Sequence, residues 1–348
     1  MISSHRNFLA WSAAYSRPVE SLSHGQLRPL RQAHRQGRPT LPRPPPQLSH
    51  WKTNMPQVCK AFFVLLVLSG ALPFTSFANG GHCPPSPWVC SSYRYKTFKF
   101  QQKDVILFGS TERPPVLLLH ELPGLTPECV SLAQRIADEG YAVYVPLLFG
   151  RVGERAFPEN LVKSALGGWK PFAADHTPRP ARTLRALTSY LARAHRGQSI
   201  GVIGMCYSGT LPLALLTEPA VNTLILCQPA RPGFAWTNRR KSAIGLSNQD
   251  IEEARKSVSE RRISILGFRF AQDKLSPSAR FKAIEELFGR DTFHDHSISV
   301  EECRMWNIRA DAHSVLTAHF TPIVGHPTEQ RFRMMINLFN ERLSSRAE

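Results

Sequence analysis

The hydrophobic pattern predicts alternating strands and helices over the part of the chain that begins near Tyr93. Residues 93–100 alternate polar and apolar positions, as a half-buried antiparallel strand does, and residues 105–108 supply its partner. Short apolar runs predict further strands over residues 116–119, 141–145, 200–203, 223–227, 263–268 and 303–308. Apolar residues at helical spacing predict helices over residues 128–139, 160–166, 181–196, 279–288 and 329–343. Strands that alternate with helices indicate an α/β fold, in which a mostly parallel sheet has helices on both faces.

One of these strand ends has the layout of a nucleophile elbow. Residues 199–209 read SIGVIGMCYSG, an apolar strand that ends at Gly204 and leads through Cys206 into an apolar helical pattern. A nucleophile at such a turn has a strained backbone, and its neighbours two positions away, here Gly204 and Ser208, must be small. A thiol there faces the N-terminus of the following helix, which favours the thiolate. The alternative interpretation is an inert buried cysteine, which is common among free cysteines.

Residues 1–54 differ in composition from the rest of the chain. They contain eight Lys or Arg and a single acid, Glu20, and so contribute +7 to the formal net charge of +17. Prolines cluster between Pro42 and Pro46, and no apolar periodicity is sustained, so the segment has too little apolar surface to offset its ordering entropy. We therefore predict a disordered extension. Its basic residues lack aromatic platforms, and we infer no nucleic-acid partner.

Residues 55–78 have the layout of a secretory signal peptide. A short basic start at Met55 precedes the apolar run of residues 61–72, which is too short to span a bilayer comfortably. Ser76 and Ala78 then occupy the positions that a signal peptidase reads. We expect translation to begin at Met55, so that residues 1–54 are an over-extended gene prediction.

This interpretation sets the domain organisation and the compartment. Residues 79–92 form the mature N-terminal segment, and residues 93–348 form one folded domain. A chain that starts at Met55 is periplasmic or secreted and has no stable membrane association once it is cleaved; otherwise it is cytoplasmic. One alternative is an uncleaved membrane anchor. A buried core helix is disfavoured, because Pro73 and the Gly- and Pro-rich residues 79–87 isolate the apolar run.

The seven cysteines suggest an oxidising compartment and no metal centre. Cys83 and Cys90 lie close enough in sequence for a disulfide that closes a short loop in the mature N-terminal segment. No CxxC pair is present, so neither a structural zinc site nor a thioredoxin-like motif is indicated. His294 and His296 lie in FHDHS, which we interpret as a solvated loop because no further ligand run is near. We predict no cofactor and no metal.

Polar residues with catalytic chemistry follow three other predicted strands. His120, Glu121 and Leu122 follow residues 116–119, Asp273 follows residues 263–268, and His313 follows residues 303–308. The carboxyl ends of parallel strands meet at one edge of the sheet, where such folds bind ligands. With Cys206 as nucleophile, the chain order nucleophile, acid, histidine is that of an α/β-hydrolase fold.

Two of these assignments have rivals. His319 lies just past the same predicted strand as His313, and we favour His313 because the loop that precedes it is shorter. Asp291 and Asp295 follow a predicted helix instead of a strand, which disfavours them as partners of the histidine. Asp311 is close to His313 in sequence, but a charge on an exposed turn accounts for it.

The chain resembles the dienelactone hydrolases, which belong to the α/β-hydrolase superfamily. The resemblance lies in LLLHELPGLTP (117–127), GMCYSG (204–209), DKLSP (273–277) and the His-Ser pair at 313–314. It extends from about residue 105 to the last helix. It implies an enzyme that hydrolyses a small-molecule ester or lactone through a Cys-His-Asp triad and a thioester.

The resemblance also implies a role for each site residue. Cys206 is the nucleophile, His313 exchanges protons with it, and Asp273 orients the imidazole. The backbone N–H groups of Leu122 and Tyr207 form the oxyanion hole, because each follows directly on a strand end beside the nucleophile. Glu121 is similar to the family's glutamate, which contacts the resting thiol and modulates its ionisation.

Two departures from the family pattern bear on the substrate. Ser208 replaces the first of two glycines that follow the neighbour of the cysteine, and Thr317 replaces an arginine that holds a substrate carboxylate. A carboxylated dienelactone is therefore disfavoured as substrate unless Arg151, Arg155 or Arg269 supplies that contact. Trp169 and Phe172, in a long loop, are candidates to shield the thiol from other thiols in an oxidising compartment.

Two other classes of function remain open. A non-catalytic protein of this fold would use the pocket only to bind a small carbonyl compound or another protein. An acyltransferase would pass the thioester to an acceptor other than water. Turnover of a chromogenic ester, with and without an added alcohol or amine, distinguishes these classes from the hydrolase.

Overall fold

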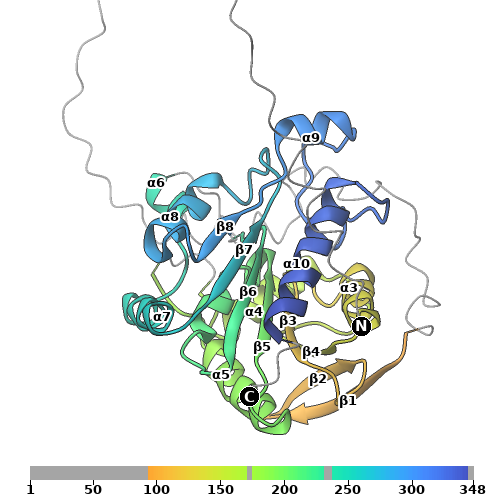
Figure 1. Cartoon of the computed structure of the whole chain (residues 1–348), viewed down its shortest axis with the longest axis vertical. Helices are drawn as coiled ribbons and strands as arrows, with labels where there is room; N and C mark the ends of the chain where they lie inside the picture. Colours follow the sequence, from red (N-terminus) through yellow and green to blue (C-terminus); the bar gives the residue numbers. More distant parts are fainter. Residues whose placement is uncertain (1–92, 171–174, 231–236, 344–348) are drawn as a thin grey trace, which may run out of the picture. The chain divides into compact units, whose positions relative to one another are not determined.

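The computed structural model describes residues 93–170, 175–230 and 237–343, and an eight-stranded sheet lies at their centre (Figure 1). The strands follow the order β1-β2-β4-β3-β5-β6-β7-β8 across the sheet. β1 pairs antiparallel with β2, β2 pairs antiparallel with β4, and all later neighbours are parallel. The bounds are β1 (Tyr95–Phe100), β2 (Lys103–Phe108), β3 (Pro115–Leu119), β4 (Ala142–Pro146), β5 (Ile200–Met205), β6 (Val221–Cys227), β7 (Ser264–Phe268) and β8 (Phe293–Asp295). The predicted mostly parallel sheet is confirmed.

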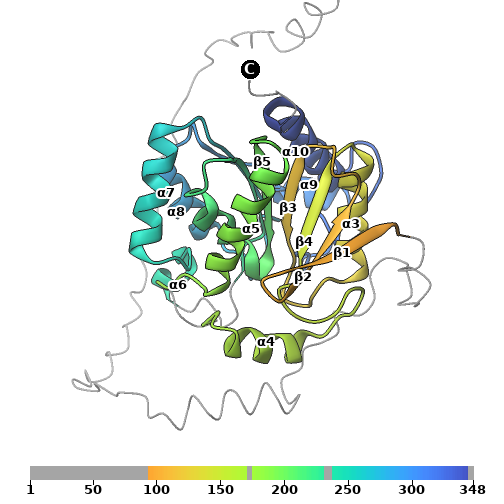
Figure 2. The same ribbon diagram turned by 90° about the horizontal axis from the view of Figure 1, so that it is seen from below.

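Helices cover both faces of this sheet, as Figure 2 shows. One face packs against α3 (Pro127–Asp138), α9 (Val300–Met305) and α10 (Pro327–Leu343). The opposite face packs against α5 (Pro180–Ala194), the 3₁₀ segment η2 (Leu211–Leu215), α7 (Asn248–Glu260) and α8 (Ser278–Phe288). α4 (Phe157–Leu166) and α6 (Asn238–Ser242) lie in the loops that follow β4 and β6. This is the α/β-hydrolase fold expected from the sequence.

The core has two halves because each strand sends alternate side chains to opposite faces. In β3, Leu117 and Leu119 pack on the α5 side, and Val116 and Leu118 pack on the α3 side. Every residue of β3, β4, β5 and β7 is buried. These strands therefore read as continuous apolar runs, which is why the sequence predicts them well.

The prediction of a last strand over residues 303–308 is wrong. These residues lie in and just after α9, which begins in a capping box: Ser299 Oγ accepts from the Glu302 N–H, and the Glu302 carboxylate accepts from the Ser299 N–H. The Ser-x-x-Glu spacing that marks this helix start is visible in the sequence. Cys303 points from α9 into the core, which explains the apolar character that suggested a strand.

The last strand is β8, over residues that we interpreted as a solvated loop. His294 pairs with Leu266 of β7 at the edge of the sheet, so the loop prediction is wrong. β8 has three residues, and His294 and Asp295 are exposed, so its polar sequence carries no strand signal. α6 and α7 have no counterpart among the helices predicted from the sequence.

The segments on which the export prediction depends lie outside the described residues. These are residues 1–54, the signal peptide at 55–78, and the mature N-terminal segment at 79–92 with its Cys83 and Cys90. In the described part of the chain, no helix combines the length and apolar character needed to cross a membrane.

Candidate active site

Cys206 lies at the apex of a tight turn that begins where β5 ends. Its φ angle is +52°, in the left-handed region that non-glycine residues rarely adopt. A Cβ atom at Gly204 would lie 2.5 Å from the Ser208 carbonyl oxygen, and one at Gly209 would lie 2.5 Å from Pro229 Cα. Both contacts are with backbone, so larger residues would displace the turn. The strained elbow predicted from the sequence is therefore present.

The segment after the elbow differs from the prediction. Two short 3₁₀ segments, η1 (Cys206–Ser208) and η2, replace the expected helix. The expected stabilisation of a Cys206 thiolate by a helix N-terminus therefore has no basis in this structure.

Ser208 connects the elbow to the end of β3 through hydrogen bonds. Its buried hydroxyl lies 2.9 Å from the Leu119 carbonyl oxygen, 3.1 Å from that of His120 and 3.0 Å from that of Met205. It accepts a hydrogen bond from the Met205 N–H at 3.2 Å. A glycine at this position could make none of these contacts.

Asp273 and His313 form a buried pair. The His313 Nδ1–H donates to Asp273 Oδ2 at 2.6 Å, and both side chains are more than nine-tenths buried. Asp273 Oδ1 accepts from the backbone N–H groups of Leu275 and Ser276. Because its other oxygen is held in this way, the carboxylate fixes both the tautomer and the orientation of the imidazole.

The second nitrogen of His313 is turned toward the thiol. In the described part of the chain, Nε2 is buried and has no hydrogen bond of good geometry. Burial opposes a charge on the imidazole, but the Cys206 sulfur and the Asp273 carboxylate raise the pKa of His313 well above 6.5. The structure therefore brings Cys206, His313 and Asp273 together.

His319 has a different place in the same loop. Its Nδ1 accepts from the backbone N–H groups of His313 and Ser314, at 3.4 and 3.2 Å. Burial and the neighbouring His313 lower the pKa of His319, which keeps it the neutral acceptor that these bonds require. His319 thus orders the loop that carries His313.

The rival aspartates lie apart from His313. Asp295 ends β8, so it does follow a strand, contrary to the prediction, but its Oδ1 accepts from Ser297 at the exposed sheet edge. Asp291 is exposed in the turn before β8. Asp311 forms an exposed ion pair with Arg309, as its assignment to a surface turn implies.

Glu121 is buried beneath the site in a hydrogen-bond network. Its Oε1 accepts from Gln228 Nε2 at 3.0 Å and from Ser314 Oγ at 2.7 Å. Among the described residues, no hydrogen bond joins Glu121 to Cys206, although the family resemblance led us to expect a contact with the resting thiol. The carboxylate contacts the loop of His313 instead, through Ser314.

Gln228 is a site residue that the sequence analysis missed. Its φ angle is +30°, and its side chain is fully buried. Besides its bond to Glu121, its Oε1 accepts from the Val315 N–H at 3.2 Å, and its N–H donates to the Phe268 carbonyl oxygen. The only signal in the sequence is a polar side chain directly after a buried strand.

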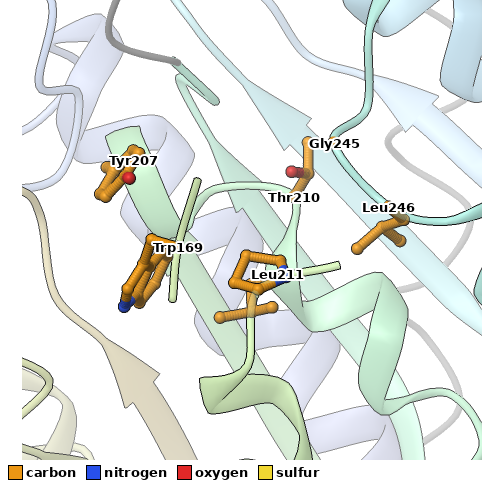
Figure 3. A pocket seen from close by; sticks show the side chains of 7 residues that line it. Trp169, Tyr207, Thr210, Leu211, Gly245 and Leu246 are labelled. Carbon is orange, nitrogen blue, oxygen red and sulfur yellow. The ribbon is translucent and has the colours of Figure 1, made fainter. Parts of the chain in front are cut away.

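Leu122 and Tyr207, the predicted oxyanion-hole residues, are both buried. The Tyr207 ring stacks on Trp169, with ring centroids 4.8 Å apart, and Figure 3 shows the two rings side by side. Phe149 packs against both of these rings and against His120. Trp169 thus belongs to an aromatic wall beside the elbow, while Phe172 lies outside the described residues.

The three arginines that were candidates to bind a substrate carboxylate interact with other protein groups. Arg269 is buried, and its guanidinium donates to the carbonyl oxygens of Ser276 and Ala271, so it shapes the Asp273 loop. Arg151 and Arg155 form exposed ion pairs with Glu154 and Glu128. As for metals, the described residues contain no group of three or more His, Cys, Asp or Glu side chains that could hold an ion.

Comparison with known proteins identifies a family for this chain. The profile of the dienelactone hydrolase family matches residues 104–288, more than half of the chain. A Saccharomyces cerevisiae protein described as "Putative carboxymethylenebutenolidase" is 26% identical over 189 residues, which is 53% of this chain and 64% of the yeast protein. The match therefore spans less than two thirds of that relative.

Solved structures with a similar fold share little sequence with this chain. A dienelactone hydrolase-like promiscuous phosphotriesterase from metagenomic libraries is 17% identical and has a TM-score of 0.45; the match covers 72% of this chain and 97% of that one. For an acylaminoacyl peptidase from Pyrococcus horikoshii, the values are 14% and 0.44, with coverage of 73% and 42%. On the match of the family profile to residues 104–288, the chain belongs to the dienelactone hydrolase family.

Proposed function

We propose that this protein hydrolyses a small ester or lactone, with Cys206 as nucleophile, His313 as general acid and base, and Asp273 as the group that orients His313. The observation that carries the proposal is the pairing of His313 with Asp273, in which His313 Nδ1 lies 2.6 Å from Asp273 Oδ2. It leaves Nε2 unpaired and close enough to Cys206 for the sulfur to raise the pKa of His313. A purely structural histidine would have this second nitrogen paired with another protein group, as most buried polar groups are.

In the acylation half, His313 Nε2 takes the proton from Cys206 Sγ, and the sulfur attacks the carbonyl carbon of the substrate. The carbonyl π electrons move to oxygen and form a tetrahedral oxyanion. When this intermediate collapses, the bond to the leaving oxygen breaks, and that oxygen receives the proton from Nε2. Asp273 stabilises the imidazolium while it exists.

In the deacylation half, water replaces the thiol. Nε2 takes a proton from the water as its oxygen attacks the thioester carbon. The second tetrahedral intermediate expels the Cys206 thiolate, which recovers the proton and releases a carboxylic acid. For a lactone, the alcohol and the acid are two ends of one product molecule.

The backbone N–H groups of Leu122 and Tyr207 are proposed to bind the oxyanion in both halves. Tyr207 directly follows the nucleophile, and Leu122 lies two residues past His120, whose carbonyl oxygen contacts the Ser208 hydroxyl. This contact supports the proposal because it ties the two segments that carry the donors. Loss of a single oxyanion donor typically costs about 10²–10³ in kcat.

The substrate is proposed to be small and to lack an obligatory carboxylate near the reacting carbonyl. Thr317 stands where the family resemblance places a carboxylate-binding arginine, and its buried Oγ1 has no partner in the described structure. Arg269 is engaged by backbone carbonyls. The name of the yeast relative nevertheless makes a carboxylated butenolide a useful comparison substrate.

Intact-protein mass spectrometry after brief exposure to a short-chain aryl ester tests this mechanism. We expect an acyl adduct on the wild type, its absence in Cys206→Ala, and in His313→Ala an adduct that forms slowly and then persists, because the base that activates both the thiol and water is missing. Cys206→Ser is the matched variant that keeps a nucleophilic atom at the same place.

Equal turnover of the ester by wild type and Cys206→Ala would overturn the proposed role of Cys206, and turnover by both no faster than in buffer alone would support a binding protein. The same reaction is repeated with an added alcohol or amine. If the acyl group passes to that acceptor in preference to water, the protein is an acyltransferase with the same first half-reaction.

A further inference from the structure

A pocket, called the second pocket below to distinguish it from the candidate active site, lies outside the catalytic group of Cys206, His313 and Asp273. It has a volume of about 410 Å³ and lies between the β1–β2 hairpin, the end of β4 and helices α4 and α5. None of the three catalytic candidates lines it. The volume is within the roughly 300–1,000 Å³ of pockets that bind small molecules.

The interior of this pocket is apolar. Val105, Leu184 and Leu187 contribute side chains that are at most 2% exposed. Phe149 and Trp169 form the wall toward the active site, because both rings also contact Tyr207, the neighbour of Cys206. These two rings thus connect the pocket with the residue next to Cys206.

The rim of the pocket is cationic. Lys103, Lys163 and Arg179 line it, and no acidic residue does. Lys163 has a partner in Glu159, with the two charged groups 3.6 Å apart. Within the described part of the chain, no acidic side chain forms an ion pair with Lys103 or Arg179, and both residues are exposed.

Arg179 is held at the rim by the backbone. Its N–H donates to the Gly168 carbonyl oxygen at 3.3 Å. Gly168 has a φ angle of +84°, and a Cβ atom there would lie 2.5 Å from Arg179 Cδ. Glycine at 168 therefore leaves room for the stem of the Arg179 side chain, which lies across this turn, while the residue itself is exposed at the mouth of the pocket.

We infer that this pocket binds a small hydrophobic carboxylate, with its apolar body against Phe149 and Trp169 and its anionic group between Lys103 and Arg179. An apolar cavity favours an uncharged body, and two unpaired cations at its mouth favour a single anion. Aromatic walls suit an aryl or branched body better than a long flexible chain. The inference does not depend on the proposed catalytic activity.

Binding of 1-naphthoate, measured by isothermal titration calorimetry, tests this site. We expect saturable binding with one molecule per chain and a Trp169-dependent change in fluorescence, which is lost in Trp169→Phe. The double variant Lys103→Gln/Arg179→Gln should bind about tenfold more weakly, since two charge-assisted contacts are lost. Arg182→Gln is the matched control, because this exposed arginine on α5 does not line the pocket.

Two further measurements separate this pocket from the active site. Carbamidomethylation of Cys206 should leave naphthoate binding unchanged, and 1-naphthalenemethanol, which lacks the charge, should bind at least fivefold more weakly. Thr183→Phe, which fills the pocket from its partly exposed side, should abolish binding.

The inference is overturned if carbamidomethylation of Cys206 abolishes binding, because the ligand would then occupy the catalytic site. It is also overturned if Lys103→Gln/Arg179→Gln binds as tightly as Arg182→Gln. Circular dichroism of each variant confirms that it is folded. None of these outcomes changes the test of the acyl-enzyme mechanism, which has its own readout.

Discussion

Ser208 is a substitution whose effect depends on its hydroxyl as well as its size. The family resemblance places a glycine here, and the sequence alone indicates only that serine is small enough for the elbow. In the structure, the hydroxyl bonds the turn and lies against two carbonyl oxygens at the end of β3. A net hydrogen bond of this kind contributes about 1 kcal/mol, comparable with the cost of the strained backbone at Cys206.

The two histidines of one loop should respond to pH in opposite directions. The pKa of His313 is raised in the folded state, so its contribution to the free energy of unfolding is full below pH 6.5 and is lost as pH rises through the folded-state pKa. The pKa of His319 is lowered, so its bonds to the loop strengthen the fold only once the imidazole is neutral. Urea unfolding of His313→Gln and His319→Gln across this range measures both contributions.

We expect the deficit of His313→Gln relative to wild type to be largest at acidic pH and to shrink as pH rises. The deficit of His319→Gln should instead grow as pH rises toward and past 6.5. Parallel curves for the two variants would contradict the assignment of different roles to these residues.

At the scale of elements, Gln228 connects four parts of the sheet edge. It follows β6, bonds Glu121 after β3, accepts from Val315 in the His313 loop and donates to Phe268 at the end of β7. Gln228→Met keeps the length of the side chain but leaves a buried carboxylate with one donor fewer. We expect a loss of about 1–3 kcal/mol in the free energy of unfolding.

Gln249→Met, on the exposed surface of α7, is the matched control for this change and should alter stability by less than about 0.5 kcal/mol. If Gln228 positions the His313 loop, its variant should also lower kcat more than it raises KM for the aryl ester. Equal stability of the two variants would show that Gln228 is dispensable.

The strands that could be predicted from the sequence are those buried on both faces of the sheet. β3, β5 and β7 are covered on both faces, so their residues are continuously apolar and their ends were located closely enough to find Cys206 and Asp273. β8 is a short edge strand with an exposed polar face, and α9 is a single capped turn-and-a-half, so neither has the periodicity that a pattern needs. The strand that was predicted before His313 is the helix α9, so the position of His313 after a strand was the wrong reason for choosing it, and the His-Ser pair of the family resemblance is the reason that remains.

The contacts that sequence could not supply are those made by side chains far apart in the chain. Gln228 and Glu121 are separated by more than a hundred residues, and the rim of the second pocket draws on β2, α4 and the residues before α5. Such groups meet only because the strand order places β4 and β3 between β2 and β5. A pattern along the chain has no information on that order unless a family resemblance provides it.

For the molecule as a whole, the redox state of the compartment determines whether its accessible thiols are oxidised. Cys129, Cys227 and Cys303 are buried, and burial raises the pKa of each thiol, which makes all three poor nucleophiles. Cys206 is the one partly exposed thiol among the described cysteines. An oxidising compartment would therefore act on Cys206 first, and export would place selective pressure on the aromatic wall beside it.

We propose that the chain is exported from Met55 and cleaved before Asn79, and N-terminal sequencing of the protein recovered from a Gram-negative host tests this. The full gene should yield a periplasmic or secreted chain that begins at Asn79. Met55→Leu should abolish this product, because no other methionine lies between Met1 and the apolar run. Leu66→Arg should retain an uncleaved chain in the cell, since a charge in the middle of a signal peptide blocks insertion. An active cytoplasmic chain that begins at Met1 would contradict export and leave Cys206 in a reducing environment.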